Sequence, residues 1–402
     1  MGEAIVVVGA GQAGSSVVAC LRKNGFAGSI TLLGAEKWLP YQRPPLSKAF
    51  LLGEVERDRL LLRPSTFYVD KDIKVITGMA VETIDRSNKV VRAGGRRLHY
   101  DHVVLATGSR PRRLDADRGG DLEGVHYLRT QDDALSLGTV LRTGHRLMVV
   151  GGGYIGLEAA AVAAKAGLNV TVVEFADRIL QRVAAKPTSD YFRFLHLGHG
   201  VDIREGVGLS EFRGGRKVTW AVLSDGTEMK IDAAVVGIGV DPNIELALGS
   251  GIDTENGVKV DQFGRTTDPH VWALGDCCSF PYKGARVRLE SVPHAIDQAE
   301  TVAENIMGKG RPYSAKPWFW SDQYNVKLQI AGLNAGFNYV IERAGVDALQ
   351  RSVWYYRDQD LVAVDAMNDA RCYIIGRRML DNGYSPPPDR IVDTGFDLKA
   401  LI

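Results

Sequence analysis

Two stretches of the chain show the same succession of hydrophobic and polar positions. An apolar run at 5–8 is followed by several glycines and then, from Ser15, by helical periodicity. The run at 146–150 is followed in the same way by glycines and by the small-residue stretch 157–166. Uninterrupted β-branched runs are typical of parallel strands that are covered on both faces. The pattern predicts two strand–turn–helix units, about 142 positions apart.

Further apolar runs follow each of these units and predict additional strands. They cover residues 29–33, 100–106, 169–173 and 232–236, and a shorter run ends at Gly275-Asp276. The runs at 100–106 and 232–236 both lead into glycine-containing segments. Small residues at a strand end let the backbone approach a ligand closely. The repeated order therefore predicts two α/β units, each with its own ligand at the strand ends.

The glycines of both turns have the spacing GxGxxG. The two segments read Gly9-Ala10-Gly11-Gln12-Ala13-Gly14 and Gly151-Gly152-Gly153-Tyr154-Ile155-Gly156. In this motif the first glycine permits a tight turn, the second admits a pyrophosphate and the third lets the helix pack on the strand. The pyrophosphate lies at the helix N-terminus. Each turn therefore predicts one bound dinucleotide.

An acidic residue after the second strand of such a unit accepts hydrogen bonds from a ribose hydroxyl. Glu174 follows Gly151 by 23 residues, which is close to the usual spacing of about 20. A carboxylate there repels a 2′-phosphate and favours NADH over NADPH, although Arg178 nearby leaves NADPH open. In the first unit, Glu36 lies slightly late, and Ala35 is the alternative for the equivalent place.

Composition restricts the function classes. The chain has 402 residues, 45% of them apolar, which suggests two or three domains with sizeable cores. Its net charge of +1 gives no overall field for nucleic acid or an anionic membrane. The apolar stretch 147–173 is broken by glycines and charged residues, and the first residues lack a signal-peptide pattern. We expect a cytoplasmic protein with neither a membrane nor a nucleic acid as partner.

The four cysteines predict no redox or metal site. They form no CxxC pair and no cluster with histidines, so we expect no bound metal. The adjacent Cys277 and Cys278 are more readily explained as two buried thiols than as a vicinal disulfide. The stretch "PYQRPPLSKAF" at 40–50 also contains no cysteine.

The motifs taken in order resemble the glutathione-reductase-like flavoproteins. The order is first GxGxxG, "LATGSRP", second GxGxxG and "ALGD", over some 275 residues. Within that superfamily, "RPPLSK", "VVGGGYIGLEAAA", "ESVPHAIDQA" and "PWFWSDQY" are similar to the NADH-dependent ferredoxin reductases, over essentially the whole chain. The resemblance implies an α/β fold with two Rossmann-like domains, the NAD domain inserted into the FAD domain, and a C-terminal α+β domain. The implied boundaries are 1–112 and 242–319 for the FAD-binding domain, 113–241 for the NAD-binding domain and 320–402 for the C-terminal domain.

The resemblance also implies which residues bind the cofactors FAD and NADH. Those expected at FAD are Gly9, Gly11, Ala13, Gly14, Ala35, Glu36, Arg43, Lys48, Val81, Ala106, Thr107, Gly108, Arg129, Gly275, Asp276 and Val292. Those expected at the nicotinamide cofactor are Gly151, Gly153, Tyr154, Ile155, Gly156, Glu158, Glu174 and Gly239.

Three residues are expected to act in the chemistry. By the resemblance, Lys48 lies along the flavin, where a cation stabilises the reduced ring, and Glu158 orients the nicotinamide and pairs with Lys48. Trp320 is expected to shield the flavin and shape the path by which electrons leave. The alternatives are a helix-surface acid for Glu158 and an ordinary core aromatic for Trp320.

The implied activity is that of an NADH-dependent ferredoxin reductase. Hydride passes from NADH to FAD, and single electrons pass to a [2Fe–2S] ferredoxin that serves a cytochrome P450 or an aromatic-ring dioxygenase. A disulfide reductase or NADH peroxidase of this fold needs a cysteine near the flavin, which 40–50 does not supply. A flavoprotein like apoptosis-inducing factor and an enzyme like monodehydroascorbate reductase remain alternatives, because both lack the dithiol.

Overall fold

The computed structural model describes residues 2–401, which fall into two compact units. Unit 1 contains 2–42, Arg57–Arg110 and Val240–Pro317, and unit 2 contains Arg43–Glu56, Pro111–Gly239 and 318–401. Within the described residues, no helix is both long and apolar enough to cross a membrane.

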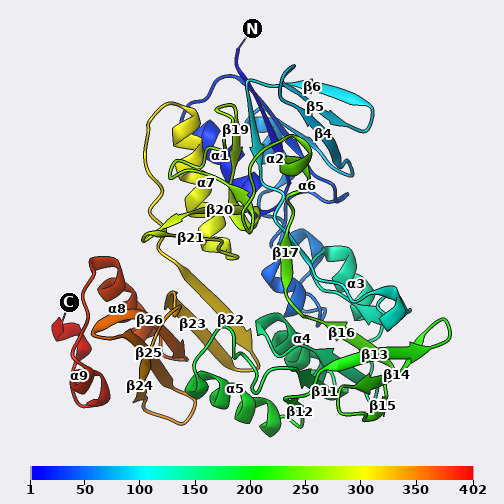
Figure 1. Cartoon of the computed structure of the whole chain (residues 1–402), viewed down its shortest axis with the longest axis vertical. Helices are drawn as coiled ribbons and strands as arrows, with labels where there is room; N and C mark the ends of the chain where they lie inside the picture. Colours follow the sequence, from blue (N-terminus) through cyan, green and yellow to red (C-terminus); the bar gives the residue numbers. More distant parts are fainter. Residues whose placement is uncertain (1, 402) are drawn as a thin grey trace. The chain divides into compact units, whose positions relative to one another are not determined.

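Unit 1 is built on a five-stranded parallel sheet with the strand order β19-β7-β1-β2-β3. The strands are β1 (Ala4–Val8), β2 (Ser29–Leu33), β3 (Ile73–Ile76), β7 (His102–Leu105) and β19 (Val271–Ala273). Helices α1 (Gln12–Lys23) and α7 (Val292–Ile306) pack side by side against one face (Figure 1). The β-branched runs of the sequence are thus central strands, buried on both faces.

Smaller elements complete unit 1. An antiparallel meander of β4 (Val81–Asp85), β5 (Val90–Ala93) and β6 (Arg96–His99) packs on the other side of the main sheet. The remaining elements are β8 (Ser109–Pro111), β17 (Val240–Pro242), β18 (Val258–Lys259), β20 (Cys278–Tyr282), β21 (Ala285–Val287), α2 (Ser65–Asp70), α6 (Glu245–Gly249) and the 3-10 turns η2 (Arg57–Leu60) and η4 (Gly275–Cys277).

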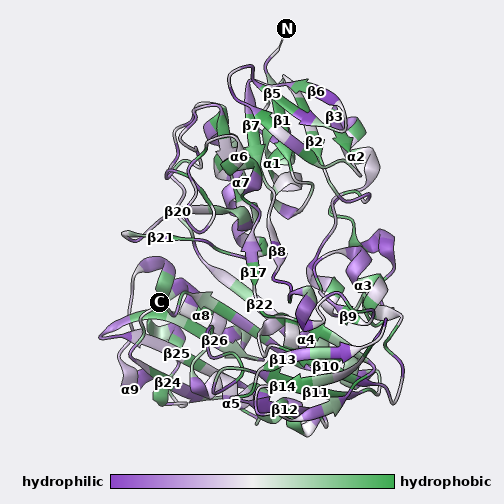
Figure 2. Ribbon diagram, turned by 45° about the vertical axis from the view of Figure 1, so that its right-hand side comes forward, coloured by the Kyte–Doolittle hydropathy of each residue, from purple (hydrophilic) through white to green (hydrophobic). Residues whose placement is uncertain are grey.

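Unit 2 repeats the architecture with the strand order β12-β11-β10-β16-β9. The strands are β9 (Val125–His126), β10 (Arg146–Val150), β11 (Asn169–Glu174), β12 (Asp202–Glu205) and β16 (Ala233–Val236), and the helices are α3 (Gln131–Gly138), α4 (Tyr154–Lys165) and α5 (Lys186–Gly198). A meander of β13 (Leu209–Gly214), β14 (Val218–Leu223) and β15 (Glu228–Lys230), with the 3-10 turns η1 (Pro44–Ser47) and η3 (Ala116–Arg118), belongs to the same unit. Figure 2 shows hydrophobic colour on the central strand β10 and hydrophilic colour on the edge strand β12.

The C-terminal part of unit 2 is an antiparallel sheet with the order β22-β23-β26-β25-β24. Its strands are β22 (Trp318–Gln323), β23 (Val326–Gly332), β24 (Tyr339–Ala344), β25 (Arg351–Arg357) and β26 (Asp360–Met367), followed by α8 (Ala370–Asn382), α9 (Pro388–Val392) and η5 (Leu398–Leu401). Helix α8 packs on β23 and β26 (Figure 1). The predicted fold class, two Rossmann-like domains and a C-terminal α+β domain, is confirmed.

Candidate functional site

The glycine turn of unit 1 forms an open cradle at the start of α1. Gly9 has φ +115°, and a Cβ there would lie 2.1 Å from the carbonyl oxygen of Ala106. A Cβ on Gly14 would lie 1.9 Å from the Gly9 oxygen, whereas one on Gly11 would meet nothing within 4 Å. Only the middle glycine therefore faces free space, which is what a pyrophosphate at a helix N-terminus requires. The residues present fit a bound dinucleotide.

Other predicted residues of unit 1 lie around this cradle. The Cβ of Ala13 is 2.9 Å from the point that a Cβ on Gly275 would occupy. Asp276 follows directly and accepts a hydrogen bond from Ser109 Oγ at 3.1 Å. The buried Gln298 accepts from the Gly275 N–H at 2.8 Å and thereby fixes this turn. The cradle and the carboxylate expected at the ribityl chain are thus linked through one short backbone segment.

The other unit 1 residues expected at FAD differ in their burial and in their hydrogen-bond partners. Glu36 accepts a hydrogen bond from the Tyr41 hydroxyl, and Ala35 is exposed. Thr107 exchanges two hydrogen bonds with Asn243, one from its Oγ1 at 2.7 Å and one to its carbonyl oxygen at 2.8 Å. The others are partly buried: Gly108 with φ +69°, Val81 at the start of β4 and Val292 at the start of α7.

The glycine turn of unit 2 has the same construction. Gly151 has φ +103°, and a Cβ there would lie 2.3 Å from the Gly237 carbonyl oxygen. A Cβ on Gly156 would lie 2.2 Å from the Gly151 oxygen, and one on Gly153 would meet nothing within 4 Å. Gly239, two residues beyond Gly237, has φ +109° and accepts a backbone bond from Arg112 at 2.9 Å. This cradle also fits a dinucleotide.

The carboxylate of Glu174 is oriented by the cradle itself. One oxygen accepts from the N–H of Gly152 at 2.7 Å, and the other accepts from the N–H of Ala176 at 2.8 Å. Arg178 donates a short hydrogen bond to Ser189. The acid therefore has a fixed position beside the turn, and the nearby cation has another partner.

Glu158 and Lys48 form a buried ion pair within unit 2. Lys48 Nζ lies 2.7 Å from Glu158 Oε2, and the side chains are 18% and 5% exposed. Ser47 donates to the same oxygen at 2.6 Å, and Ser321 donates to Oε1 at 2.7 Å. An ionised carboxylate is stable away from water only when it has such donors. The structure thus brings together Ser47 at the end of η1, the lysine that follows it, the glutamate of α4 and a serine of β22.

Two further pairings involve residues named from the sequence. Arg43 Nη1 donates to the carbonyl oxygen of Arg129 at 2.7 Å. The Tyr154 ring packs on Phe319 at 5.1 Å between centroids, and its buried hydroxyl has no hydrogen-bond partner among residues 2–401. Trp320 is partly exposed, with its ring 5.7 Å from that of Trp318, and Ile155 is 43% exposed.

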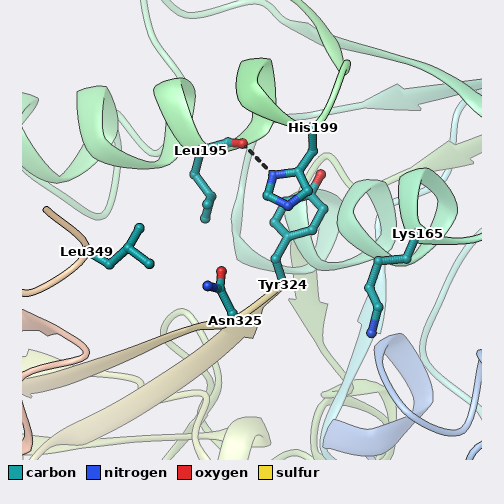
Figure 3. A pocket seen from close by; sticks show the side chains of 6 residues that line it. All are labelled: Lys165, Leu195, His199, Tyr324, Asn325 and Leu349. Atoms are coloured by element: carbon teal, nitrogen blue, oxygen red, sulfur yellow. Dashed lines mark hydrogen bonds between the residues drawn. The ribbon is translucent and has the colours of Figure 1, made fainter.

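Sequence reasoning missed Ser47 and Ser321 as ligands of Glu158. Both occur in motifs that the sequence singled out, "RPPLSK" and "PWFWSDQY", but their spacing of more than 270 positions gives no sign that they meet. A second missed feature is an open pocket of about 440 Å³ in unit 2 (Figure 3). It is lined by Lys165, Leu195, His199, Tyr324, Asn325 and Leu349. Among the described residues, no group of acidic, histidine or cysteine side chains has the arrangement of a metal site.

Two Rossmann-like sheets, each with a glycine cradle that fits a dinucleotide, define an oxidoreductase that uses a flavin and a nicotinamide. Residues 3–299 match the family described as pyridine nucleotide-disulphide oxidoreductase, and residues 318–402 match the reductase C-terminal domain.

The chain is similar to proteins named as ferredoxin reductases. It is 42% identical to rhodocoxin reductase from Rhodococcus erythropolis, covering 99% of this chain and 94% of the relative. It is 44% identical to a ferredoxin–NAD(P)+ reductase from a Sphingomonas species, covering 94% and 92%. The covalent complex of putidaredoxin reductase with putidaredoxin matches at TM-score 0.96 and 38% identity, covering 99% and 98%. The chain belongs to the pyridine nucleotide-disulphide oxidoreductase family, in its ferredoxin reductase branch.

Proposed function

We propose that this chain is an FAD-dependent NADH:ferredoxin oxidoreductase. It passes single electrons to a [2Fe–2S] ferredoxin that serves a cytochrome P450 or an aromatic-ring oxygenase. The observation that carries this proposal is the Lys48–Glu158 pair. Lys48 lies in the cysteine-free stretch 40–50, which is where the resemblance places the redox cysteines of the dithiol enzymes of this fold. Burial raises the pKa of the thiol at Cys20, Cys277, Cys278 and Cys372, which keeps them protonated and poor as relay groups.

Bound FAD supplies the redox chemistry, because it accepts a hydride and releases electrons singly. The cradle at Gly9–Gly14 would hold its pyrophosphate, and the Asp276 carboxylate would accept hydrogen bonds from its ribityl hydroxyls. The cradle at Gly151–Gly156 holds the nicotinamide dinucleotide. Positioning of the two reactants accounts for much of the rate, since it removes the entropy cost of their encounter.

Glu158 would orient the nicotinamide through its carboxylate, whose Oε2 is held by Lys48 and Ser47 and whose Oε1 is held by Ser321. Lys48 would lie along the flavin, where its positive charge would stabilise the negative charge that reduction adds to the ring. A buried ammonium paired with one carboxylate does this without solvent reorganisation. Loss of either partner leaves the other as an uncompensated buried charge.

NADH is the preferred nicotinamide cofactor. The fixed Glu174 carboxylate accepts from the ribose hydroxyls and repels a 2′-phosphate. Arg178, whose position near Glu174 in the sequence left NADPH as an alternative, donates hydrogen bonds to Ser189 and to the Gln181 carbonyl oxygen. The relatives' names include both NAD+ and NAD(P)+ reductases, so the preference depends on these side chains. A cytoplasmic location stays a prediction from the sequence.

The direct test is steady-state NADH oxidation by the flavin-loaded protein with a panel of acceptors. The panel contains several [2Fe–2S] ferredoxins, cytochrome c, O₂ and an artificial dye, each repeated with NADPH. Fast ferredoxin-dependent turnover with little O₂ consumption is expected. High O₂ or peroxide turnover without stimulation by any ferredoxin contradicts the proposal, and fast reduction of a small organic radical alone favours the monodehydroascorbate reductase alternative.

Trp320 is proposed to shape the path of electrons from the flavin to the ferredoxin. Trp320→Ala should lower the rate with ferredoxin more than the rate with the dye. Trp220→Ala is the matched control, because Trp220 lies on β14 and is also partly exposed. Equal losses in both assays for Trp320→Ala contradict this role.

A further inference from the structure

A line of buried polar side chains extends from Glu158 to the surface of unit 2. Ser321 donates to Glu158 and accepts from Gln323 Nε2 at 3.2 Å. Gln323 Oε1 lies 2.8 Å from His196 Nε2, and His196 Nδ1 lies 3.2 Å from the Tyr324 hydroxyl. Ser321, Gln323 and His196 are each at most 1% exposed.

The donors along this line all point toward Glu158. The Gln323 amide nitrogen donates to Ser321, so its oxygen must accept from the Nε2–H of His196. Burial lowers the pKa of His196 to about 4, so the ring is neutral at ordinary pH and its Nδ1 accepts from Tyr324. Because Ser321 accepts from Gln323, its own hydrogen is directed to the carboxylate. Each bond therefore fixes the direction of the next.

This line does not transfer protons. A primary amide relays a proton only through its unfavourable imidic form, and Gln323 is in the middle of the line. Its effect is electrostatic and geometric: aligned hydrogen bonds polarise one another, and a fully satisfied buried network fixes side-chain positions. Of the two elements that build the line, β22 also contributes Phe319, whose ring packs on Tyr154 of the glycine cradle.

The outer end of the line lies at the open pocket of Figure 3. Tyr324 is partly exposed there, and its ring is stacked on His199 with 3.6 Å between centroids. His199 Nδ1 is 2.9 Å from the Leu195 carbonyl oxygen, which fixes the ring at the end of α5 (Figure 3). The stacking keeps the phenol ring in place, so its hydroxyl stays on His196.

We propose that Gln323 and His196 are positioning residues for hydride transfer: they hold the Ser321 hydroxyl on Glu158 and thereby fix the carboxylate that orients the nicotinamide. This inference rests on the proposed role of Glu158. Gln323 of β22 and His196 of α5 would thus influence hydride transfer without contacting the reacting groups.

The experiment is a double-mutant cycle in the flavin-loaded full chain. Gln323→Met preserves the length of the side chain and removes both of its hydrogen bonds. It should lower the rate of flavin reduction by NADH about five- to tenfold, and weaken NAD+ binding in calorimetry by a similar factor. In the Glu158→Gln background, the same change should have less than about a twofold effect, because residues that act through one group are not additive.

Thr188→Val is the matched control. Thr188 is fully buried on α5 and donates to Asp365 at 2.8 Å, outside the line to Glu158. Thr188→Val should leave the rate of flavin reduction and the affinity for NAD+ within about twofold of the wild type. It should lower the melting temperature as much as Gln323→Met does. Tyr324→Phe is a second, milder variant that keeps the stacked ring and should reduce the rate about two- to threefold, with the same non-additivity.

The outcomes separate the two proposals. If Glu158→Gln leaves flavin reduction and NAD+ binding unchanged, the proposed role of Glu158 is wrong. If Glu158→Gln impairs them but Gln323→Met and Tyr324→Phe behave like Thr188→Val, the positioning role is overturned and the proposed function stands. Full additivity of Gln323→Met with Glu158→Gln also overturns it, because a merely structural effect does not depend on residue 158.

Discussion

The glycine turn of unit 1 and that of unit 2 have almost the same backbone but different surroundings. Gly9 N–H and Gly151 N–H each donate at 2.8 Å to the last or next-to-last residue of the neighbouring strand, Leu33 and Val173. Gly14 and Gly156, the glycines that let the helix pack on the strand, have equally little room for a Cβ. At the position before them, however, Ala13 is 8% exposed and Ile155 is 43% exposed.

The difference in exposure corresponds to a difference in what each turn has to do. Ala13 is covered by the Gly275 segment of its own unit, which suits a cofactor that remains bound through many turnovers. Ile155 is open, which suits a dinucleotide that binds and leaves in every cycle. The acids differ as well, since Glu174 is bonded to its glycine turn and Glu36 is bonded to Tyr41. One sequence motif thus gives two sites with different exchange properties.

The largest expected effect comes from closing each cradle separately. Gly14→Ala places a Cβ against the Gly9 carbonyl oxygen, and we expect protein without bound flavin, seen as loss of its visible absorbance. Gly156→Ala should keep the flavin but raise KM for NADH by about 100-fold, or about 2.7 kcal/mol. Gly198→Ala, with nothing within 4 Å of its Cβ, is the control for unit 2. Flavin loss in both cradle variants contradicts the assignment of one cofactor to each turn.

The next prediction concerns the unit 2 site, where Lys48 is the cation that pairs with Glu158. Lys48→Met leaves the buried Glu158 without its cation and removes the positive charge proposed to stabilise the reduced flavin, and we expect the rate of flavin reduction by NADH to fall about 100-fold. Lys165→Met is the control, because its pairing with Glu54 is exposed and 3.9 Å long. Such surface pairs contribute about 0–1 kcal/mol. Equal effects of the two substitutions, measured by stopped-flow, contradict a special role for Lys48.

The two acids give the next test. Glu174→Ala should reduce the ratio of kcat/KM for NADH to that for NADPH by about tenfold or more, because it removes both an acceptor for the ribose and a repulsive charge. Glu36→Ala should leave this ratio unchanged. A change of the ratio in Glu36→Ala, or none in Glu174→Ala, shows that the acids were assigned to the wrong cofactors.

The last comparison concerns stability in acid and involves neither cradle. Burial lowers the pKa of His294 in unit 1 to about 4, below its ordinary 6.5, so the unfolded chain takes up the proton first. The stability of unit 1 therefore falls between pH 6.5 and 4, by up to about 3 kcal/mol. In unit 2, His196 contributes a loss of the same sign. Burial raises the pKa of Asp365 to about 6, and its protonation in the folded state adds stability between pH 6 and 3.8.

Unit 1 should thus be the more acid-sensitive part. Calorimetry of the wild type between pH 7 and 4.5 should show the larger destabilisation in the transition that carries the flavin. Asp365→Asn should raise the melting temperature at pH 8 and have little effect at pH 4, since the wild-type carboxyl is then protonated. A stabilisation of equal size at both pH values contradicts the raised pKa of Asp365.

Local sequence patterns were sufficient to predict the main strands and both glycine cradles. The apolar runs correspond to β1, β2, β10 and β11 within one residue, because a strand buried on both faces admits few polar positions. The glycines were identifiable for a related reason. A positive φ, or a Cβ that would lie about 2 Å from a carbonyl oxygen, excludes other residues, so the constraint is visible in the sequence.

Contacts between distant segments were decided only by the tertiary structure. The sequence named Lys48 and Glu158, but the serines that complete the carboxylate's shell come from η1 and β22, and the line through Gln323 and His196 joins β22 to α5. The grouping of Arg43–Glu56 with unit 2 is of the same kind. Serine, glutamine and histidine occur equally well on a protein surface, so the sequence alone does not indicate that these particular residues are buried. Only the fold supplies the partners that make such polar groups stable inside the protein.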